Sequence, residues 1–508
     1  MRKNLIFISA LLTGCADNYN DIIQKDMDEH LSKEYKSPIP IEDLKEFPKG
    51  RNLMVVGKLP NWLSGVYFRT GPGKFNFGKE DNQSSSHFFD GHAFFTSFNI
   101  KSGTIDYHSS MAKTDQYLES VATGKNMLWG VQTAVSTDSI EKRVSRDGQK
   151  VMTTNPAVNV VQVGPYFATL GETLLPVTVD PITTETKGVL DYDDEHLKVK
   201  KAWESAHPKI DPDSGTLYGM FIEYGLTSDY NVYKINAGSS KREIISKISV
   251  KCPGYMHDMS ITKNYVVLVE SPITVNPMTL LTEKYGFLGA HRWEPNKKTN
   301  VYVISKKTGE IVKKVEVDPF FTWHHFNAFE NKDGKINIFV RWYDDARAAI
   351  LVPSATITDK KYNTKAHFVR LEVDIQKEDA KKHIISDIVF EFATVPDHLV
   401  GKENRYFYGV IFVQEEAGIA KYDLKTNTYI SWNLKNGICG EPRFVPNPNA
   451  TSEDDGVVMT IAYDPSLRKS FFVVLDAKTL KEIARAEAPQ IIPKGLHGAF
   501  FPTKTLTK

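Results

Sequence analysis

Apolar and polar residues follow one another in short runs along most of this chain. Apolar or aromatic runs lie at 66–68, 158–163, 265–269, 301–304, 336–340 and 471–475. Turn sequences such as Lys307-Thr308-Gly309, Asp333-Gly334 and Asp213-Ser214-Gly215 separate the runs, which is the pattern of short strands joined by tight turns. We find no long, capped segment of helical period. The pattern therefore predicts an all-β protein.

The length of the β-rich region limits the architectures that it can adopt. We assign residues 51–508 to a single domain. So many antiparallel strands form either a series of sandwiches or a β-propeller. Segment 301–316 has the strand, turn, strand order of a meander, and no strict repeat is visible, so we favour a propeller with divergent blades. The pattern alone does not lead beyond an all-β fold.

The first residues have the pattern of a targeting signal. Met1-Arg2-Lys3 precede an apolar run at 5–12, which is too short for a bilayer span of about 20 residues and fits a secretory signal. Residues 12–15 (LTGC) resemble a bacterial lipoprotein box. We expect a signal peptide over 1–15 with acylation of Cys15; the alternative is a mispredicted start or a buried strand with an incidental cysteine.

The segment after Cys15 would connect this anchor to the domain. Residues 16–50 are polar and charged, with a few apolar positions at loosely helical spacing, so we expect a tether with a short helix. An acylated cysteine would hold the protein at a membrane. Ala16, rather than Asp, follows the cysteine, which by analogy with bacterial sorting favours the outer membrane. The expected location is exported, at the outer membrane or the periplasmic face.

Charge and cysteine content exclude several classes of function. The chain has 63 Lys and Arg against 62 Asp and Glu, without the basic excess of a nucleic-acid binder. Three cysteines are too few for a disulfide framework or a cysteine-based metal site. Nothing in the sequence places Cys252 and Cys439 together, and Cys252 fits a small buried apolar residue. The 14 histidines are therefore the main candidates for chemistry.

Four histidines stand in short motifs of unlike composition. The motifs are 206–212 (AHPKIDP), 256–262 (MHDMSIT), 323–330 (WHHFNAFE) and 496–500 (LHGAF). Gaps of 50, 67 and 173 residues separate the histidines, which is not the local spacing of a zinc motif. Such scatter is expected if several blades each contribute one ligand to a central axis. A lone histidine, however, is more often a hydrogen-bonded structural residue.

Together with other motifs in the same order, these segments resemble the carotenoid cleavage oxygenase family. The further motifs are 59–73 (LPNWLSGVYFRTGPG), 87–94 (HFFDGHAF), 441–446 (EPRFVP) and 453–458 (EDDGVV). The resemblance extends from about residue 50 to the end. Family members commonly have Asn at the place of Thr70 and Asp at the place of His92. The resemblance implies a seven-bladed β-propeller, with loops and short helices capping one face over an axial iron site.

The resemblance also implies one Fe(II) per chain, bound by four histidines and no carboxylate. Position by position, the ligands are His207, His257, His324 and His497. His324 is preferred to its neighbour His325 because the family ligand precedes the motif asparagine, here Asn327, by three residues. Neutral imidazoles suit Fe(II) and would leave positions open for O₂.

Three glutamates are expected behind these ligands, since a metal-bound histidine needs an acceptor for its other ring N–H. By resemblance they are Glu172, Glu391 and Glu441. Glu391 has the family spacing of 14 residues before Arg405, although Ala393 and Thr394 replace the usual proline and arginine. The alternative for each is a solvated carboxylate at a strand end. Glu172 lies in an apolar context, where an unpaired carboxylate would be costly.

The implied activity is cleavage of a conjugated C=C bond of a carotenoid or apocarotenoid by O₂, giving two carbonyl products. The alternatives are stilbene-type cleavage, isomerisation without oxygen, and a non-catalytic, lipid-anchored propeller that binds polyenes. Gly171 stands where stilbene-cleaving members usually have lysine, which favours a carotenoid.

The expected partners are an apolar polyene and O₂, with neither nucleic acid nor a protein partner implied. Segment 277–288 is either an apolar membrane-contact patch or an ordinary buried connection. The motifs do not indicate which double bond of the substrate is cleaved.

Overall fold

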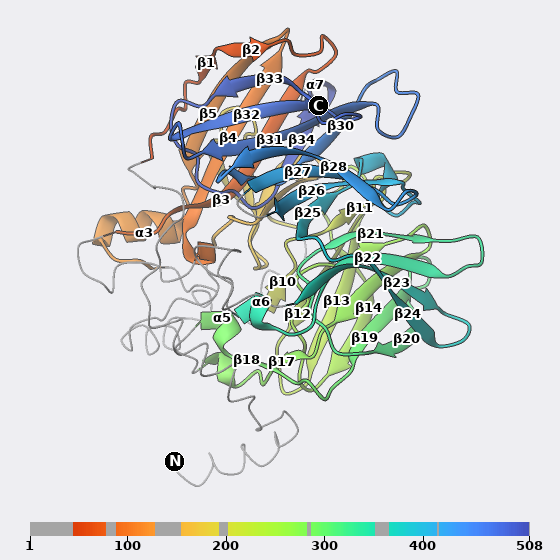
Figure 1. Ribbon diagram of the computed structural model, residues 1–508. Helices are drawn as coiled ribbons and strands as arrows, with labels where there is room; N and C mark the ends of the chain where they lie inside the picture. The colour runs from red at the N-terminus through yellow and green to blue at the C-terminus, as the bar shows by residue number, and fades with distance from the viewer. Residues whose placement is uncertain are drawn as a thin grey trace.

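The computed structural model describes seven stretches of the chain: 44–77, 88–127, 154–192, 202–281, 286–350, 365–413 and 416–506. They form a seven-bladed β-propeller with few helices, as the sequence analysis predicts. In Figure 1 the sheets follow one another in chain order, from the orange strands at the top through the green strands below and back to the blue strands at the top. The predicted signal peptide, Cys15 and most of the tether lie outside the described residues.

The blades are antiparallel sheets of four to six strands. The first blade holds β1 (Arg51–Leu53), β5 (Thr104–Met111), β4 (His92–Lys101), β3 (Gly65–Lys74) and β34 (Gly498–Pro502). The second holds β6 (Asn159–Val163), β7 (Tyr166–Leu170), β8 (Val177–Val179) and β9 (Thr186–Val189). The third holds β10 (Ala202–Glu204), β11 (Lys209–Ile210), β12 (Leu217–Glu223), β13 (Ser228–Ile235) and β14 (Glu243–Val250).

The next three blades have four strands each. The fourth holds β15 (Ser260–Ile261), β16 (Tyr265–Glu270), β19 (Thr299–Ser305) and β20 (Ile311–Val317), with the hairpin β17 (Ile273–Val275) and β18 (His291–Trp293) inserted after β16. The fifth holds β21 (His325–Glu330), β22 (Ile336–Tyr343), β23 (Ala366–Asp374) and β24 (Asp379–Ser386). The sixth holds β25 (Phe390–Thr394), β26 (Tyr406–Val413), β27 (Glu416–Asp423) and β28 (Thr428–Lys435).

Both ends of the described chain close the ring. The last blade holds β2 (Val55–Gly57), β33 (Glu482–Glu487), β32 (Lys469–Asp476), β31 (Gly456–Asp464), β30 (Arg443–Pro446) and β29 (Ile438–Cys439). The early strand β2 thus joins the last blade through Val55↔Ala486, and the late strand β34 joins the first blade through Val66↔Phe501. Each of these two blades therefore contains one strand from the opposite end of the chain. This pairing joins the first blade to the last, where an open sheet edge would otherwise be exposed.

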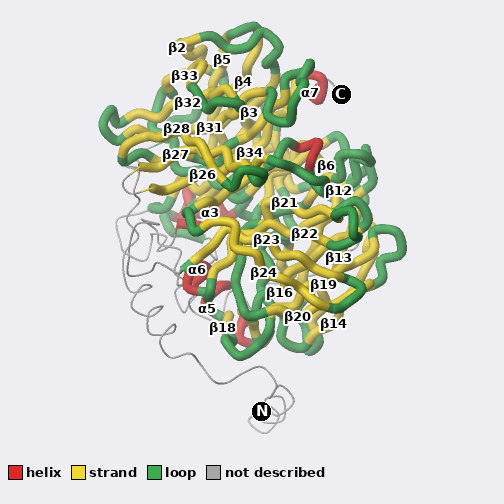
Figure 2. Tube along the Cα trace, turned by 45° about the vertical axis from the view of Figure 1, so that its right-hand side comes forward, coloured by secondary structure: helices red, strands yellow, loops and turns green. Residues whose placement is uncertain are grey.

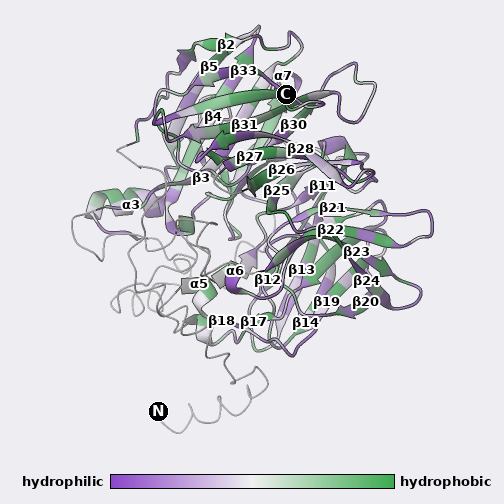
Figure 3. Ribbon diagram, in the orientation of Figure 1, coloured by the Kyte–Doolittle hydropathy of each residue, from purple (hydrophilic) through white to green (hydrophobic). Residues whose placement is uncertain are grey.

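The hydrophobic pattern differs between the middle and the outside of a blade. β16 and β22 are buried along almost their whole length because neighbouring blades cover both of their faces, and such strands read as continuous apolar runs. The outer strands β24 and β28 are mostly exposed or half-buried. Figure 3 shows hydrophobic residues along the strands and polar residues at many of the turns. Each predicted apolar run falls on a strand for this reason.

The predicted turns also fall between paired strands. Gly309 lies between β19 and β20 with a φ of +74°. A side chain there would bring its Cβ to 1.8 Å from the carbonyl oxygen of Ile245. Glycine is therefore required at this turn for both its backbone conformation and its lack of a side chain.

The described stretches hold seven short helices (Figure 2), of which the last follows β34: η2 (Phe88–Asp90), α3 (Asp115–Thr123), η4 (Thr279–Leu281), α5 (Gly286–Gly289), α6 (Arg347–Ile350), η6 (Asp397–Leu399) and α7 (Thr503–Leu506). α3 is capped by the Thr114 hydroxyl and by Gly124 in the left-handed conformation. The sequence analysis missed α3 because its apolar residues Leu118 and Val121 are exposed and give no buried stripe. No helix in the described stretches is long and apolar enough to cross a membrane.

Cys252, which follows β14, and Cys439, in β29, do not form a disulfide bond with each other. Cys439 is buried and free, so Cys252 and Cys439 are not joined. Cys252 is half-buried rather than fully buried, because it follows β14 in a connection next to the exposed Lys251. The expectation that it is a buried apolar residue was wrong on this point.

Candidate metal centre

Each of the four predicted ligand histidines lies one to three residues before the start of a strand. His207 precedes β11, His257 precedes β15, His324 precedes β21 and His497 precedes β34. β15 packs against β21, and β34 packs against β6 and β30. The starts of strands that run side by side around one axis lie at the same end of the ring. Residues far apart in the chain therefore meet there.

The four imidazoles form one buried cluster. One nitrogen from each lies within 4.8 Å of the others, and no histidine of the four is more than 9% exposed. The Nε2 atoms of His207 and His257 are 3.0 Å apart. The Ser205 hydroxyl connects these two residues, since it accepts from the His207 N–H and donates to the His257 carbonyl. The structure thus brings all four predicted residues together.

His325 does not take part in the cluster. Its Nδ1 lies 2.9 Å from the Ser260 hydroxyl, and its backbone N–H donates to Asp258. Burial lowers the pKa of His325 to about 4. His324 therefore occupies the position that the sequence analysis assigned to it.

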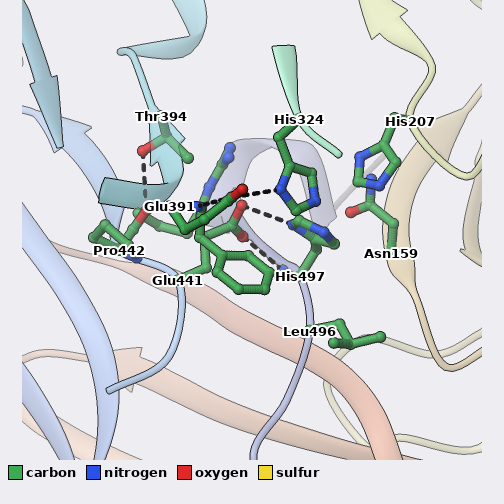
Figure 4. Close-up of polar contacts among 12 residues, drawn as sticks. Asn159, His207, His324, Glu391, Thr394, Glu441, Pro442, Leu496 and His497 are labelled. Carbon is green, nitrogen blue, oxygen red and sulfur yellow. Dashed lines mark hydrogen bonds and ion pairs between the residues drawn. The ribbon is translucent and has the colours of Figure 1, made fainter. Parts of the chain in front are cut away.

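Three of the four imidazoles are held from behind by the predicted glutamates. The Nδ1 to carboxylate distances are 2.6 Å for His257 and Glu172, 2.8 Å for His324 and Glu391, and 2.9 Å for His497 and Glu441. Figure 4 shows the second and third of these pairs. A carboxylate on Nδ1 fixes the proton there and leaves the Nε2 lone pair for the centre. No such carboxylate lies behind His207 among the described residues.

The carboxylates have further donors of their own. Tyr255 donates to Glu172, Tyr343 donates to Glu391, and the Gly498 N–H donates to Glu441. Burial alone would raise the pKa of Glu441, but the interaction with His497 through its Nδ1–H, together with the nearby Arg443 and Arg69, outweighs it and lowers this pKa to about 2. The carboxylate is therefore ionised and serves as an acceptor at neutral pH.

The donor set fits a divalent transition metal. The Nε2 of His324 is buried and has no hydrogen-bond partner. Burial lowers the pKa of His497 to about 4 and that of His207 well below its usual value, so these imidazoles are neutral. The Nε2 atoms of His207 and His257 face each other at 3.0 Å, and two nitrogen lone pairs at that distance repel unless a cation or a proton lies between them. An all-imidazole site with no carboxylate ligand suits Fe(II), among other divalent ions.

A further polar network, absent from the sequence analysis, connects three ligand segments. Asp258 follows His257, and its carboxylate lies 2.8 Å from the Lys209 amine. It also accepts from the backbone N–H of His325 at 2.9 Å. Lys209 lies two residues after His207, and His325 follows His324. The buried Asp258 therefore fixes the relative positions of three segments that each carry a ligand.

We expect Asp258→Asn to weaken metal binding without unfolding the protein. The amide cannot neutralise Lys209, so the three segments lose their shared charge contact. Loss of groups that support metal ligands costs roughly 10- to 100-fold in affinity, and we expect the low end of that range because Asp258 does not touch an imidazole. Competition with a chelator measures the change, with the exposed turn residue Asp333→Asn as control. Unchanged affinity would show that the network has no positioning role.

Aromatic side chains surround the imidazole cluster. The Trp323 ring centre is 4.7 Å from that of His257, and Phe89 packs on Trp323 at 5.8 Å. On another side, Phe392 lies 5.0 Å from His324 and 5.1 Å from His497. A centre enclosed by aromatic rings excludes water and favours an apolar ligand.

Comparisons with known proteins agree with this geometry. The family model described as retinal pigment epithelial membrane protein matches residues 42–502. A chloroplastic carotenoid cleavage dioxygenase 8 of Arabidopsis thaliana is 30% identical over 89% of this chain and 83% of its own length. A mitochondrial carotenoid-cleaving dioxygenase of Mustela putorius furo is 29% identical over 90% of this chain and 95% of its own.

Solved structures share the fold. An apocarotenoid oxygenase of Synechocystis, in a Glu-to-Gln variant, superposes with a TM-score of 0.79 at 24% identity, covering 94% of this chain and 99% of its own. A cobalt-substituted form also has a TM-score of 0.79 and covers 93% of this chain. At this level of identity the likeness shows the seven-bladed architecture.

Proposed function

This chain belongs to the family of the retinal pigment epithelial membrane protein and the carotenoid cleavage oxygenases, and we propose that it is an Fe(II)-dependent dioxygenase. Its substrate would be a carotenoid or apocarotenoid, cleaved at a conjugated C=C bond to give two carbonyl products. The observation that carries the proposal is the buried cluster of His207, His257, His324 and His497. The carotenoid-cleaving names of the relatives support the substrate class.

The residues of this chain have separate tasks in the proposed reaction. An Fe(II) ion held by the four imidazoles would supply the site of O₂ activation beside the double bond. Glu172, Glu391 and Glu441 keep the Nδ1 protons in place, so that each Nε2 faces the centre. The aromatic rings around the cluster hold an apolar polyene in register, and this register decides which bond is exposed to oxygen.

Iron analysis and product analysis together test the proposal. Purified protein loaded with Fe(II) should hold about one ion per chain. It is then incubated in air with carotenoids, apocarotenals and resveratrol-type stilbenes, and the products are identified by mass. Two carbonyl fragments from a carotenoid or apocarotenoid support the proposal, whereas cleavage of stilbenes alone contradicts the substrate class. Iron-loaded protein that forms no product contradicts the activity itself.

We further propose that the protein is exported and anchored by acylation of Cys15. The signal-like residues 1–15 support this location. Among the described residues of segment 277–288, Met278 is 41% exposed and so available for membrane contact, whereas Leu288 is fully buried. The burial of Leu288 fits the alternative that the C-terminal end of this segment is an ordinary buried connection.

A Cys15→Ser variant should move the protein from the membrane fraction to the soluble fraction. Serine cannot form the thioether that carries the lipid, and a soluble domain would then lose its main membrane anchor. Metabolic labelling with radioactive palmitate should mark the natural protein and not the variant. Equal labelling, or equal membrane association, would contradict the anchor.

A further inference from the structure

Lys494 carries an amine that the proposed reaction does not yet use. It lies in the segment leading into β34, three residues before His497. Its Nζ is 6.0 Å from the ring centre of Phe392. The Phe392 ring in turn contacts His324 at 5.0 Å and His497 at 5.1 Å. A single aromatic ring therefore connects this amine to the metal centre.

The surroundings of the Phe392 ring are apolar. This ring packs on a cluster formed by Phe75, Phe88 and Leu496, together with the half-buried Phe89 and Val158. In the described stretches of the chain, the Lys494 amine forms no hydrogen bond and no ion pair. Lys494 is half-buried, so the apolar cluster partly desolvates its amine, and this is costly unless an acceptor reaches it.

The nearby charged groups do not provide that acceptor. Glu391 is the carboxylate that attracts Lys494, but its oxygens already accept from His324, Tyr343 and the Phe392 N–H. The other neighbouring charge is the Arg69 guanidinium, which repels the amine. Burial, with a smaller effect of Arg69, lowers the pKa of Lys494 to about 8. The amine is still mostly protonated at neutral pH, and in the described stretches no carboxylate forms an ion pair with it.

We propose that Lys494 is a specificity-determining residue that binds an oxygen-bearing end group of the substrate. The inference rests on the proposed function, because it places a substrate over the metal centre. The amine lies no more than about 11 Å from the His324 ring, since its 6.0 Å and the 5.0 Å of that ring both end at the centre of Phe392. The oxygen is therefore on the short arm of the substrate, close to the cleaved bond. A carboxylate is bound most tightly, and a carbonyl or hydroxyl oxygen less so.

Anaerobic binding separates recognition from turnover. Iron-loaded protein without O₂ is titrated with an apocarotenoid acid, the matching aldehyde and alcohol, and β-carotene, with tryptophan fluorescence as the signal. We expect the natural protein to bind the acid roughly 10- to 100-fold more tightly than the alcohol, which is the size of a charged hydrogen bond. Lys494→Met should abolish this preference and leave the Kd of β-carotene unchanged. Lys494→Arg should restore most of it.

A matched control and the aerobic reaction separate this inference from the proposed function. Lys435→Met removes an exposed lysine at the end of β28 and should change no Kd. The inference fails if Lys494→Met keeps the acid preference, or if it weakens all four ligands equally as a packing defect would. If the natural protein shows the Lys494-dependent preference but forms no product in air, the dioxygenase fails and the binding role stands. If it cleaves polyenes without the preference, only the role of Lys494 fails.

Discussion

Replacing His257 with alanine is expected to abolish both metal retention and polyene cleavage. The His257 Nε2 lies 3.0 Å from that of His207, so its loss opens the cluster on one side. It also leaves Glu172 without the imidazole that its carboxylate supports. Iron content should fall from about one ion per chain to near zero, because a structural ligand set loses affinity steeply when one member is removed. Iron analysis after gel filtration measures the first effect, and product analysis in air measures the second.

An exposed histidine provides the matched control for this prediction. His398→Ala removes an imidazole from η6 at the surface and should leave iron content and turnover unchanged. Far-ultraviolet circular dichroism of both variants establishes that the propeller is intact. A folded His257→Ala protein that retains iron and cleaves normally would show that His257 is not a ligand.

The all-β character of the chain could be predicted because each blade buries its middle strands on both faces. β16 and β22 are such strands, and their continuous apolar runs are visible in the sequence. Ring closure could not be predicted from the pattern. It depends on the pairs Val55↔Ala486 and Val66↔Phe501, which join opposite ends of the chain and leave no local signal. The pattern therefore only favoured a propeller over sandwiches, and the seven blades came from the family resemblance.

Sequence and structure contribute differently to the metal centre. Motif resemblance identified four histidines and three glutamates, but only the fold shows which carboxylate supports which imidazole. Asp258 and Lys494 were not predicted as functional residues, because their roles depend on burial and on neighbours from other blades. Nothing in the sequence near Asp258 shows that it faces Lys209 and His325. Burial of a charge in this way is a property of the tertiary structure.

Changing Glu441 to glutamine is expected to weaken iron binding roughly 10- to 100-fold, as for other groups that orient metal-bound histidines. The two carboxylate oxygens accept from the His497 Nδ1 and the Gly498 N–H, at 2.9 and 3.1 Å. An amide has only one oxygen, so its NH₂ group must face one of these two donors. The conflict is relieved if the His497 proton moves from Nδ1 to Nε2. That tautomer cannot bind a metal, because the lone pair of Nε2 is lost.

The tautomer argument makes the effect of Glu441→Gln depend on iron concentration. His207, His257 and His324 remain in place, so saturating Fe(II) should recover much of the turnover that is lost at limiting iron. The exposed Glu416→Gln variant is the control for loss of one negative charge. Glu441→Asp keeps the charge but shortens the reach, and should weaken iron binding less than the amide does. If Glu441→Gln binds Fe(II) as tightly as the natural protein, the carboxylate does not set the His497 tautomer, and its burial beside Arg69 must then serve packing alone.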